Sequence, residues 1–518
     1  MRRGAGLVLL GLAMLTLAPE GNSGCVGNTN TFDVSPDGKT LYLSLNADAG
    51  LEADESSSLY AFDVEAGRLR ALCGRAAEMG FCAISPDGKT LAFLENVKGN
   101  LAVKTLSLEA NAEKTILDAE GVAGSPRFVP GFPDRLLVLA GKAWNVLGEK
   151  GLEPVLPAED VGTGVPPALA PRRAAFTVTR KLPPAPGAEE EAVEQDIVVV
   201  DFTEQGRREA ARVTVNELDE KDHAPSCQPL LSGDGKRLAV IVRQEGSSSV
   251  READLANGKL GAKLFRIGES DAVSFTPDGR GFAILRQSAD SASLMEIAVR
   301  RDGNADEKRA LVVPGGWTGG TDVVLRWVSD RRMRLWRVSN EGISSFEVNA
   351  DGTNPEAKRL PRAKLAVQRR LADAAYALEH KDTVSPKSRP EPAKADGQPE
   401  PIGARVLRER AEAEWAAADA AAKPVVDAVN GQKPDASKLL EAAWAGASGW
   451  KKVPGFPEPM RMVLEIKSRE LAEAQALLDR CSKDPAFADH DRKDLEKTVH
   501  DLEEEIADLR NSLPHPAP

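Results

Sequence analysis

The sequence predicts an all-β propeller of about seven four-stranded blades, followed by an α-helical C-terminal domain. The first observation is a repeated phrase at residues 32–43 and 82–93: an apolar strand, then Ser-Pro-Asp-Gly-Lys-Thr, then a second apolar strand. The second is the return of this phrase in altered form at 230–241 and 273–284. Two half-buried strands cannot bury their own faces, so copies that recur about every 40 to 50 residues must stack, as propeller blades do.

Seven apolar second strands can be aligned between residues 28 and 362, and each has the pattern of a half-buried strand. We therefore expect a closed ring over this range, with every blade built as strand, turn, strand, loop, strand, turn, strand. The seven segments are 40–45, 90–95, 135–140, 174–179, 237–242, 281–286 and 333–338.

The Ser-Pro-Asp-Gly turn is expected to be structural rather than catalytic. Pro presets the first turn dihedral, Asp bonds its own backbone, and Gly takes the positive dihedral that reverses the chain. Three of the predicted blades keep only PGFPDR, APRR or VSDRR in its place.

These hairpins resemble the TolB-like propeller repeats, which are relatives of the WD repeat, over roughly two thirds of the chain. Such repeats occur in periplasmic TolB, which binds partner proteins at the cell envelope, and in the propellers that cover prolyl-oligopeptidase-type hydrolases. The resemblance implies a scaffold fold and no single activity. The chain departs from TolB because no α/β domain precedes the predicted propeller and helices follow it.

Residues 1–24 have the layout of an export signal, which predicts an extracytoplasmic protein of the periplasm or cell envelope. Two arginines stand directly before an apolar run from Leu7 to Ala18. This run is shorter than the roughly 20 residues that span a bilayer. A buried N-terminal strand is the alternative interpretation.

Cys25 is a candidate lipidation site, because the small residues Ser23 and Gly24 precede it. The resemblance to a lipidation motif is partial, since Asn22 stands where such a motif has leucine. Cys73 and Cys82 are close enough in sequence for a candidate disulfide between two blades. The two remaining cysteines, Cys227 and Cys481, are expected to be buried free thiols.

The C-terminal part divides into a helix at 363–381, a disordered linker at 382–401 and a helical domain at 402–513. The linker is rich in Pro, Lys, Glu and Asp and has almost no apolar side chains. The helical domain is predicted to contain helices at Ile402–Lys423, Ser437–Ala447, Met460–Cys481 and Asp491–Ser512.

The last two helices are expected to form an antiparallel coiled-coil hairpin. Leu464, Leu471 and Leu478 recur every seven residues on the first, and apolar residues on the second alternate spacings of four and three. The short connection between the helices favours pairing within the chain. An intermolecular coiled coil, and hence an oligomer through these helices, is the alternative.

Composition and motifs narrow the classes of function. The formal net charge of -12 argues against general nucleic-acid binding. No Gly-x-Ser-x-Gly, phosphate-binding loop, His-Glu-x-x-His or Cys-x-x-Cys motif occurs, so we expect no cofactor, metal or catalytic residue and no membrane contact except through a lipid anchor. We favour an exported non-enzymatic scaffold for protein–protein interaction. A propeller-type glycosidase or lyase with acids in the central funnel is the alternative.

Propeller topology predicts one basic and one acidic face, because first and third connections emerge on one side of the disc and the others on the opposite side. The first connections carry Lys39, Lys89, Arg172, Arg173, Lys236, Arg237, Arg280, Arg331 and Arg332. Long loops on the other side carry Asp48, Glu52, Asp54, Glu55, Glu189, Glu190, Glu191, Glu194, Glu217, Asp219, Glu220 and Asp222. We expect this acidic face to bind a basic protein partner, with plain solvation of the loops as the alternative.

Overall fold

The computed structural model describes most of residues 32–512. Its longest internal gaps are 46–57, 119–125, 182–192, 216–225, 315–321 and 385–401. The predicted export signal and the candidate lipidation site Cys25 lie outside the described residues. Within the described ranges, no helix is both long enough and apolar enough to cross a membrane.

The first repeated turn joins β1 (Phe32–Val34) to β2 (Thr40–Leu45). The Ser35 hydroxyl donates to Asp37 Oδ1 at 2.6 Å, and the Gly38 amide donates to the Ser35 carbonyl at 2.8 Å. Gly38 has a φ of 70°, a value that glycine adopts without strain. The same hydroxyl-to-carboxylate bond recurs in the other three copies. The predicted structural role of this turn is confirmed.

A side chain at the turn glycine should therefore destabilise the protein. Gly88 has a φ of 73°, so we expect Gly88→Ala to cost about 1–2 kcal/mol of unfolding free energy. Gly446 is a control because it lies in a helix and a Cβ there would meet nothing within 4 Å. We expect Gly446→Ala to be neutral or to stabilise by up to about 1 kcal/mol. Equal urea midpoints for the two variants would contradict the turn argument.

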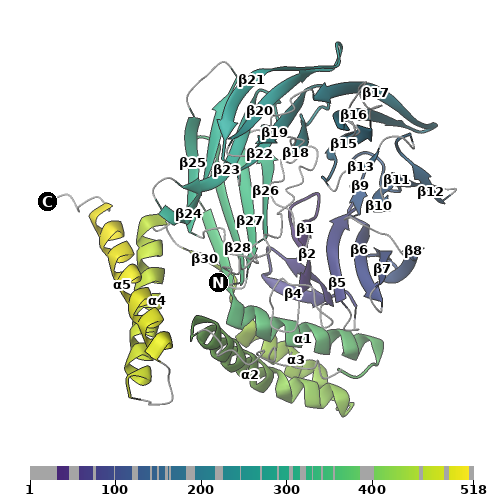
Figure 1. Cartoon of the computed structure of the whole chain (residues 1–518). Coiled ribbons are helices and arrows are strands. Elements are labelled where there is room, and N and C mark those ends of the chain that lie inside the picture. The colour runs from purple at the N-terminus through teal and green to yellow at the C-terminus, as the bar shows by residue number, and fades with distance from the viewer. Residues whose placement is uncertain are drawn as a thin grey trace, which may run out of the picture.

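Four sheets are separate four-stranded antiparallel meanders, arranged around a common centre (Figure 1). The first sheet contains β1, β2, β3 (Ser58–Asp63) and β4 (Arg68–Ala71). The second contains β5 (Glu78–Ile84), β6 (Thr90–Val97), β7 (Asn100–Ser107) and β8 (Ala112–Asp118). The third contains β9 (Arg127–Phe128), β10 (Leu136–Ala140), β11 (Ala143–Gly148) and β12 (Gly151–Pro154). The penultimate contains β22 (Ala272–Phe275), β23 (Gly281–Ser288), β24 (Ser291–Arg301) and β25 (Glu307–Pro314).

The last sheet has five strands, because a segment from much later in the chain joins its edge. It contains β26 (Asp322–Ser329), β27 (Arg332–Ser339), β28 (Gly342–Asn349), β29 (Glu356–Pro361) and β30 (Lys451–Val453). β30 pairs antiparallel with β29 and was not predicted from the sequence.

The remaining sheet has nine strands. It contains β13 (Val161–Gly162), β14 (Ala168–Ala170), β15 (Arg173–Lys181), β16 (Val193–Thr203), β17 (Gly206–Val215), β18 (Ser226–Leu231), β19 (Leu238–Gln244), β20 (Ser247–Asp254) and β21 (Lys259–Ile267). Two antiparallel meanders meet in it where Thr214 of β17 pairs in parallel with Lys259 of β21.

The propeller-like fold is confirmed, and all seven predicted second strands are strands of the structure. The prediction of seven separate four-stranded blades is not confirmed, because five sheets stand alone and the sixth has nine strands. The close approach of β17 and β21 explains the merger. A Cβ at Gly258, just before β21, would lie 2.6 Å from the carbonyl oxygen of Arg212 in β17, so a glycine is required there.

The described residues after β29 form five helices: α1 (Arg362–His380), α2 (Ile402–Asn430), α3 (Ala436–Ala447), α4 (Pro459–Cys481) and α5 (Asp489–Ser512). The helical C-terminal region is thus confirmed. α2 continues past Pro424, where the sequence predicted its end. The extension buries Val425 and Val429 in the core, and this packing outweighs the poor helix propensity of proline.

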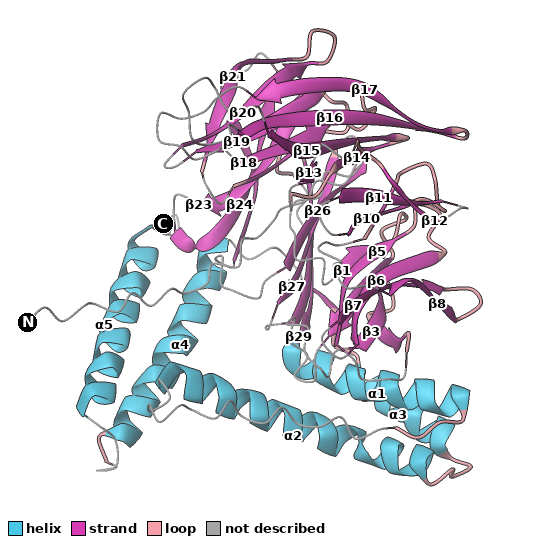
Figure 2. Ribbon diagram, turned by 45° about the vertical axis from the view of Figure 1, so that its right-hand side comes forward, coloured by secondary structure: helices cyan, strands magenta, loops and turns pink. Residues whose placement is uncertain are grey.

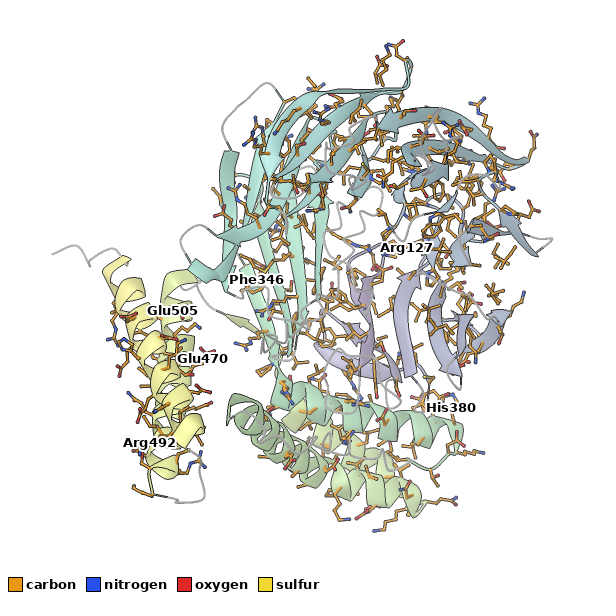
Figure 3. The ribbon with its side chains drawn as sticks, in the orientation of Figure 1. Arg127, Phe346, His380, Glu470, Arg492 and Glu505 are labelled. Carbon is orange, nitrogen blue, oxygen red and sulfur yellow. The ribbon has the colours of Figure 1, made fainter. Side chains whose placement is uncertain are left out.

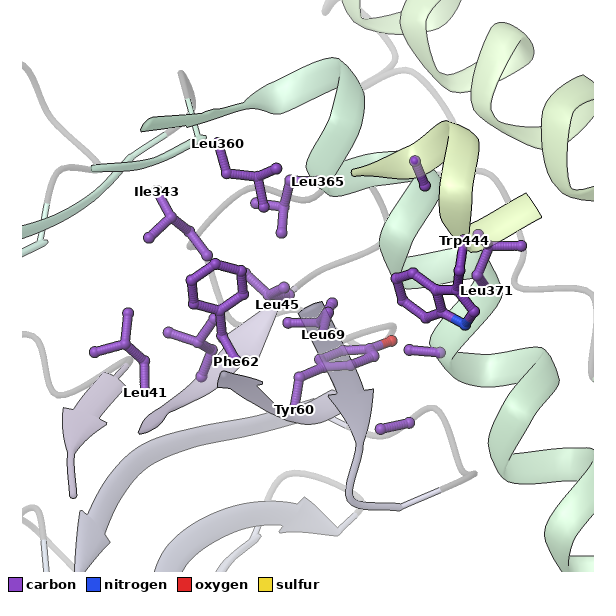
Figure 4. Packing of buried hydrophobic residues seen from close by; sticks show 14 of the residues in the cluster. Leu41, Leu45, Tyr60, Phe62, Leu69, Ile343, Leu360, Leu365, Leu371 and Trp444 are labelled. Atoms are coloured by element: carbon purple, nitrogen blue, oxygen red, sulfur yellow. The ribbon is translucent and has the colours of Figure 1, made fainter. Parts of the chain in front are cut away.

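The helices α1, α2 and α3 share one hydrophobic cluster with the first and last sheets (Figure 4). Leu371 of α1 and Trp444 of α3 belong to the same cluster as Tyr60 and Phe62 of β3. The helices α2 and α3 therefore share a core with the propeller sheets. The predicted domain boundary at residue 402 placed them in a separate domain. Figure 2 shows the three helices together beneath the sheets.

The helices α4 and α5 form an antiparallel hairpin beside the propeller (Figure 1). Leu477, Cys481 and Leu495 are its buried cluster. Two of the leucines that recur every seven residues, Leu471 and Leu478, are only half-buried. The hairpin prediction agrees with this packing, and the coiled coil is not confirmed.

Candidate interaction surface

The predicted acidic face cannot be placed as a whole. Eleven of its twelve residues lie in segments outside the described ranges, within 46–57, 182–192 and 216–225. The twelfth, Glu194, lies in β16, where its backbone is in register with Arg180 of β15. The acidic face and its basic partner therefore stay predictions.

The repeated turns lie on the face that was predicted to be basic. Several basic side chains on this face pair with acids. Basic residues of first connections form exposed ion pairs with acids of third connections in three places. These pairs are Lys39–Glu65 at 3.7 Å, Lys89–Glu109 at 3.0 Å and Arg172–Glu204 at 3.5 Å. First and third connections thus lie on one side, as propeller topology predicts, and this face has mixed charge.

Arginines near the start of second strands fasten neighbouring meanders together. Each donates from Nη1 to the backbone carbonyl of a turn glycine in the next meander around the ring. The bonds are Arg173 to Gly235 at 2.7 Å, Arg237 to Gly279, and Arg334 to Gly38 at 3.3 Å. Arg173 and Arg237, predicted as part of a basic face, therefore hold the fold together, and the role of Arg334 was missed.

The lowered pKa values of two turn aspartates lead us to expect a specific dependence of stability on pH. Hydrogen bonds from Ser35 and Ser232 lower the pKa values of Asp37 and Asp234 below the ordinary 3.8. A carboxyl whose pKa is lowered by folding contributes stability above its ordinary pKa and loses it as pH falls through the lowered value. We expect the double variant Asp37→Asn, Asp234→Asn to lose less thermal stability than the unsubstituted protein below about pH 4.

The matched variant is Ser35→Ala with Ser232→Ala, which keeps both carboxyls and removes the hydroxyls that bond them. Its melting temperature should depend on acid less steeply than that of the unsubstituted protein, as for the aspartate variant. If the double variants and the unsubstituted chain showed the same acid dependence, the serine bonds would contribute nothing to it.

Asp33 in β1 joins three sheets through one buried carboxylate. Its Oδ1 accepts a bond from the Arg326 guanidinium of the last sheet at 2.6 Å and one from the Val34 amide at 2.7 Å. Its Oδ2 accepts from the Ile84 amide of the second sheet at 2.9 Å. The Asp33 side chain is only 7% exposed, so these partners compensate the cost of burying its charge. This carboxylate therefore stabilises the packing of the inner strands through hydrogen bonds from protein donors.

Other buried acids are paired inside their own sheets. Asp196 lies 2.9 Å from Arg212, and Glu296 lies 2.7 Å from Arg286. Within the described parts of the chain, no three His, Cys, Asp or Glu side chains group closely enough to hold a metal ion.

The predicted disulfide between Cys73 and Cys82 is not formed in the structure, where both side chains are buried reduced thiols. Both side chains lie in one cluster between the first and second sheets, where they act as small apolar residues. Burial raises the pKa of the Cys82 thiol far above its usual range, which disfavours the reactive thiolate. Cys227 and Cys481 are buried and form no disulfide, in agreement with the prediction.

No protein-family model matches the chain, and no curated protein matches its sequence. Among similar solved structures, TolB from Acinetobacter baumannii is 13% identical with a TM-score of 0.34, and the match covers 63% of this chain and 65% of TolB. The chain thus spans just under two thirds of TolB. The periplasmic gluconolactonase PpgL of Pseudomonas aeruginosa is 16% identical with a TM-score of 0.35, covering 56% of this chain and 87% of PpgL.

A third similar structure, an oligogalacturonate lyase in complex with manganese, is 11% identical with a TM-score of 0.40, covering 61% of this chain and 82% of the lyase. These likenesses concern the fold alone. The sheets and the four repeated turns of this chain carry the fold assignment by themselves. In fold, the chain is a propeller-like protein, and its four repeated turns resemble those of TolB-like repeats.

Proposed function

We propose that this chain is an exported scaffold that binds a protein partner at the cell envelope, rather than an enzyme. The observation that supports this most is the α4–α5 hairpin, hereafter the arm, which stands beside the propeller (Figure 1). A rigid body that carries a projecting arm is suited to hold a partner in a defined position.

The base of the arm is fastened to the propeller shortly before α4 begins. Trp450 packs edge-on against Phe62 of β3, with ring centroids 5.1 Å apart. β30 then pairs with β29 through three residue pairs, from Arg359↔Lys451 to Ala357↔Val453. The start of α4 also lies beside β24 and β25. These contacts restrict where the arm can point.

The exposed chemistry of the arm favours a basic partner. Among the described residues of α4 and α5, exposed acids outnumber exposed bases. The acids are Glu470, Glu473, Asp479, Asp494, Glu496, Asp501, Glu503 and Glu504, and the bases are Arg480, Arg492, Lys493, Lys497 and Arg510. Figure 3 shows Glu470 and Glu505 on the two helices of the arm, where both pair with Lys467 at 3.2 Å. An excess of negative charge along a helix accelerates association with a positively charged partner. The predicted acidic loops of the propeller would add to this attraction.

Export and the blade count complete the proposal. The N-terminal Arg-Arg and apolar run support secretion, and Cys25 would supply a lipid anchor. The nine-stranded sheet would count as two blades of a seven-bladed ring, since it contains two meanders joined by one parallel pairing. Cell fractionation and mass spectrometry of the mature N-terminus test export.

Site-specific photo-crosslinking in the native host tests the interaction. We place a photoreactive residue at Glu504 on the arm, at Glu190 in a predicted acidic loop, and at Asp134, an exposed control in a turn on the opposite face. The proposal predicts the same discrete protein adduct from Glu504 and Glu190 and none from Asp134. Adducts at Asp134 alone, or at none of the three positions, would contradict it.

A further inference from the structure

We infer that α1, α2, α3 and β30 form a strap that closes the ring of sheets from outside, so that the first and last sheets separate only when the strap is released. The strap acts at the boundary between the first and last sheets, hereafter the seam. This role is independent of what the arm binds.

The seam differs from every other boundary in how the chain crosses it. Consecutive sheets are connected directly by short segments, which keep them close together. The first sheet draws its described strands from residues 32–71, whereas the last draws its own from 322–361 and 451–453. Among the described strands, neither sheet contributes a strand to the other, so these strands meet at the seam through side chains and through what covers them.

Two hydrogen bonds between side chains and groups of the described residues cross the seam. The Asp33 carboxylate accepts a bond from Arg326 at 2.6 Å, and Arg334 donates to the Gly38 carbonyl at 3.3 Å. Leu41 and Leu43 of β2 also share a hydrophobic cluster with Trp336 of β27 across the seam.

α1 lies across the seam and touches three sheets. It begins at Arg362, directly after the last residue of β29, and packs on β28, β29 and β4. At its far end His380 lies against the second sheet, where its Nε2 is 3.1 Å from Asn111 Nδ2 (Figure 3). A single helix therefore spans from the last sheet across the first to the second.

Buried polar contacts fix α1 at one position on the first sheet. Gln368 is 1% exposed; it accepts a bond from the Leu69 amide at 3.1 Å and donates to the Gly67 carbonyl at 2.9 Å. The fully buried Arg369 donates to the Tyr60 hydroxyl at 2.9 Å, and that hydroxyl donates to Asp373 at 2.9 Å. Sliding α1 along the sheet would leave these groups without partners in the core, so the register is specific.

α2 and α3 hold α1 against the sheets from behind. Gln368 also donates to the Ala447 carbonyl of α3 at 3.2 Å, and Arg370 bonds Asp419 of α2 at 2.5 Å. Arg68 of β4 lies over the ring of Trp444, 4.4 Å from its centroid. Together with the β29–β30 pairing, these contacts connect the edges of both sheets at the seam to the same three helices.

A cleavable full-length chain tests the strap. A protease site placed within 385–401, between α1 and α2, allows the folded protein to be cut without removing residues. We expect the two pieces to elute together in size-exclusion chromatography, because α2, α3 and β30 stay bound. When mild urea removes the C-terminal piece, the melting temperature of the sheets should fall by about 5 °C or more.

Two glutamine variants of the same cleavable chain supply the comparison. Gln368→Ala removes contacts with both the first sheet and α3, and it should increase the rate of separation at least tenfold. Gln475→Ala removes a similar amide from the arm, where it donates to Glu503 at 3.2 Å, and should leave that rate unchanged. The inference is overturned if the unsubstituted pieces separate spontaneously, or if the sheets melt at the same temperature with and without the C-terminal piece.

Discussion

Replacing Asp33 with alanine is expected to lower the free energy of unfolding by about 3–5 kcal/mol, the range for a buried ion pair that loses one partner. The side chains of Asp33 and Arg326 are 7% and 15% exposed, so the arginine would stay buried with its main acceptor gone. The Ile84 amide of the second sheet would lose its acceptor as well. Urea unfolding followed by circular dichroism measures the change.

The matched control is Glu65→Ala in the same sheet. Glu65 also pairs with a base, Lys39, but both side chains are well exposed, at 72% and 61%. Exposed pairs contribute about 0.2–1 kcal/mol, so the control should move the urea midpoint little. Similar losses for Asp33→Ala and Glu65→Ala would show that Asp33 does not join the inner strands.

Replacing Trp444 with alanine is the second change with a large expected effect. Trp444 is 7% exposed and belongs to the cluster that α1–α3 share with the first and last sheets. Emptying a buried tryptophan site costs about 3–5 kcal/mol. Because the cluster is shared, strand and helix signals should both shift to lower urea in one transition.

The control for Trp444→Ala is Leu477→Ala in the buried cluster of the arm. This substitution should weaken the helical signal of α4 and α5 and leave the strand transition in place. The shared-core interpretation is wrong if Trp444→Ala lowers the helical transition while the strands unfold where they did before.

Much of the fold could be predicted because its signals are local. The turn at 35–40 contains its own hydroxyl, carboxylate and glycine, and the apolar strand after it has the period of a half-buried strand. The helices α1, α3, α4 and α5 begin and end within two residues of their predicted bounds. In each case the residues that determine the element lie inside it.

Contacts between distant segments could not be predicted in the same way. β30 is only three residues long, and its pairing with β29 depends on where α3 ends. The Thr214–Lys259 pairing depends on two strand edges that approach at Gly258. The sequence predicted α2 and α3 as helices, but it did not indicate that they would pack on α1 and share a core with the first and last sheets.

The polar contacts of the seam left weaker traces in the sequence. Asp33 lies in an otherwise apolar inner strand, and a buried carboxylate there requires a partner. The sequence around Asp33 does not indicate that this partner is Arg326. The acidic loops were recognised by composition alone, and such segments carry no pattern that fixes their position.

Native-state hydrogen exchange on the intact chain tests the strap most directly. The amides of β2 and β27, on the two sides of the seam, should open with the same free energy as those of α1 and α3, while α4 and α5 open more easily. If α1 and α3 instead exchange through an easier opening that leaves β2 and β27 protected, the helices cover the seam without closing it.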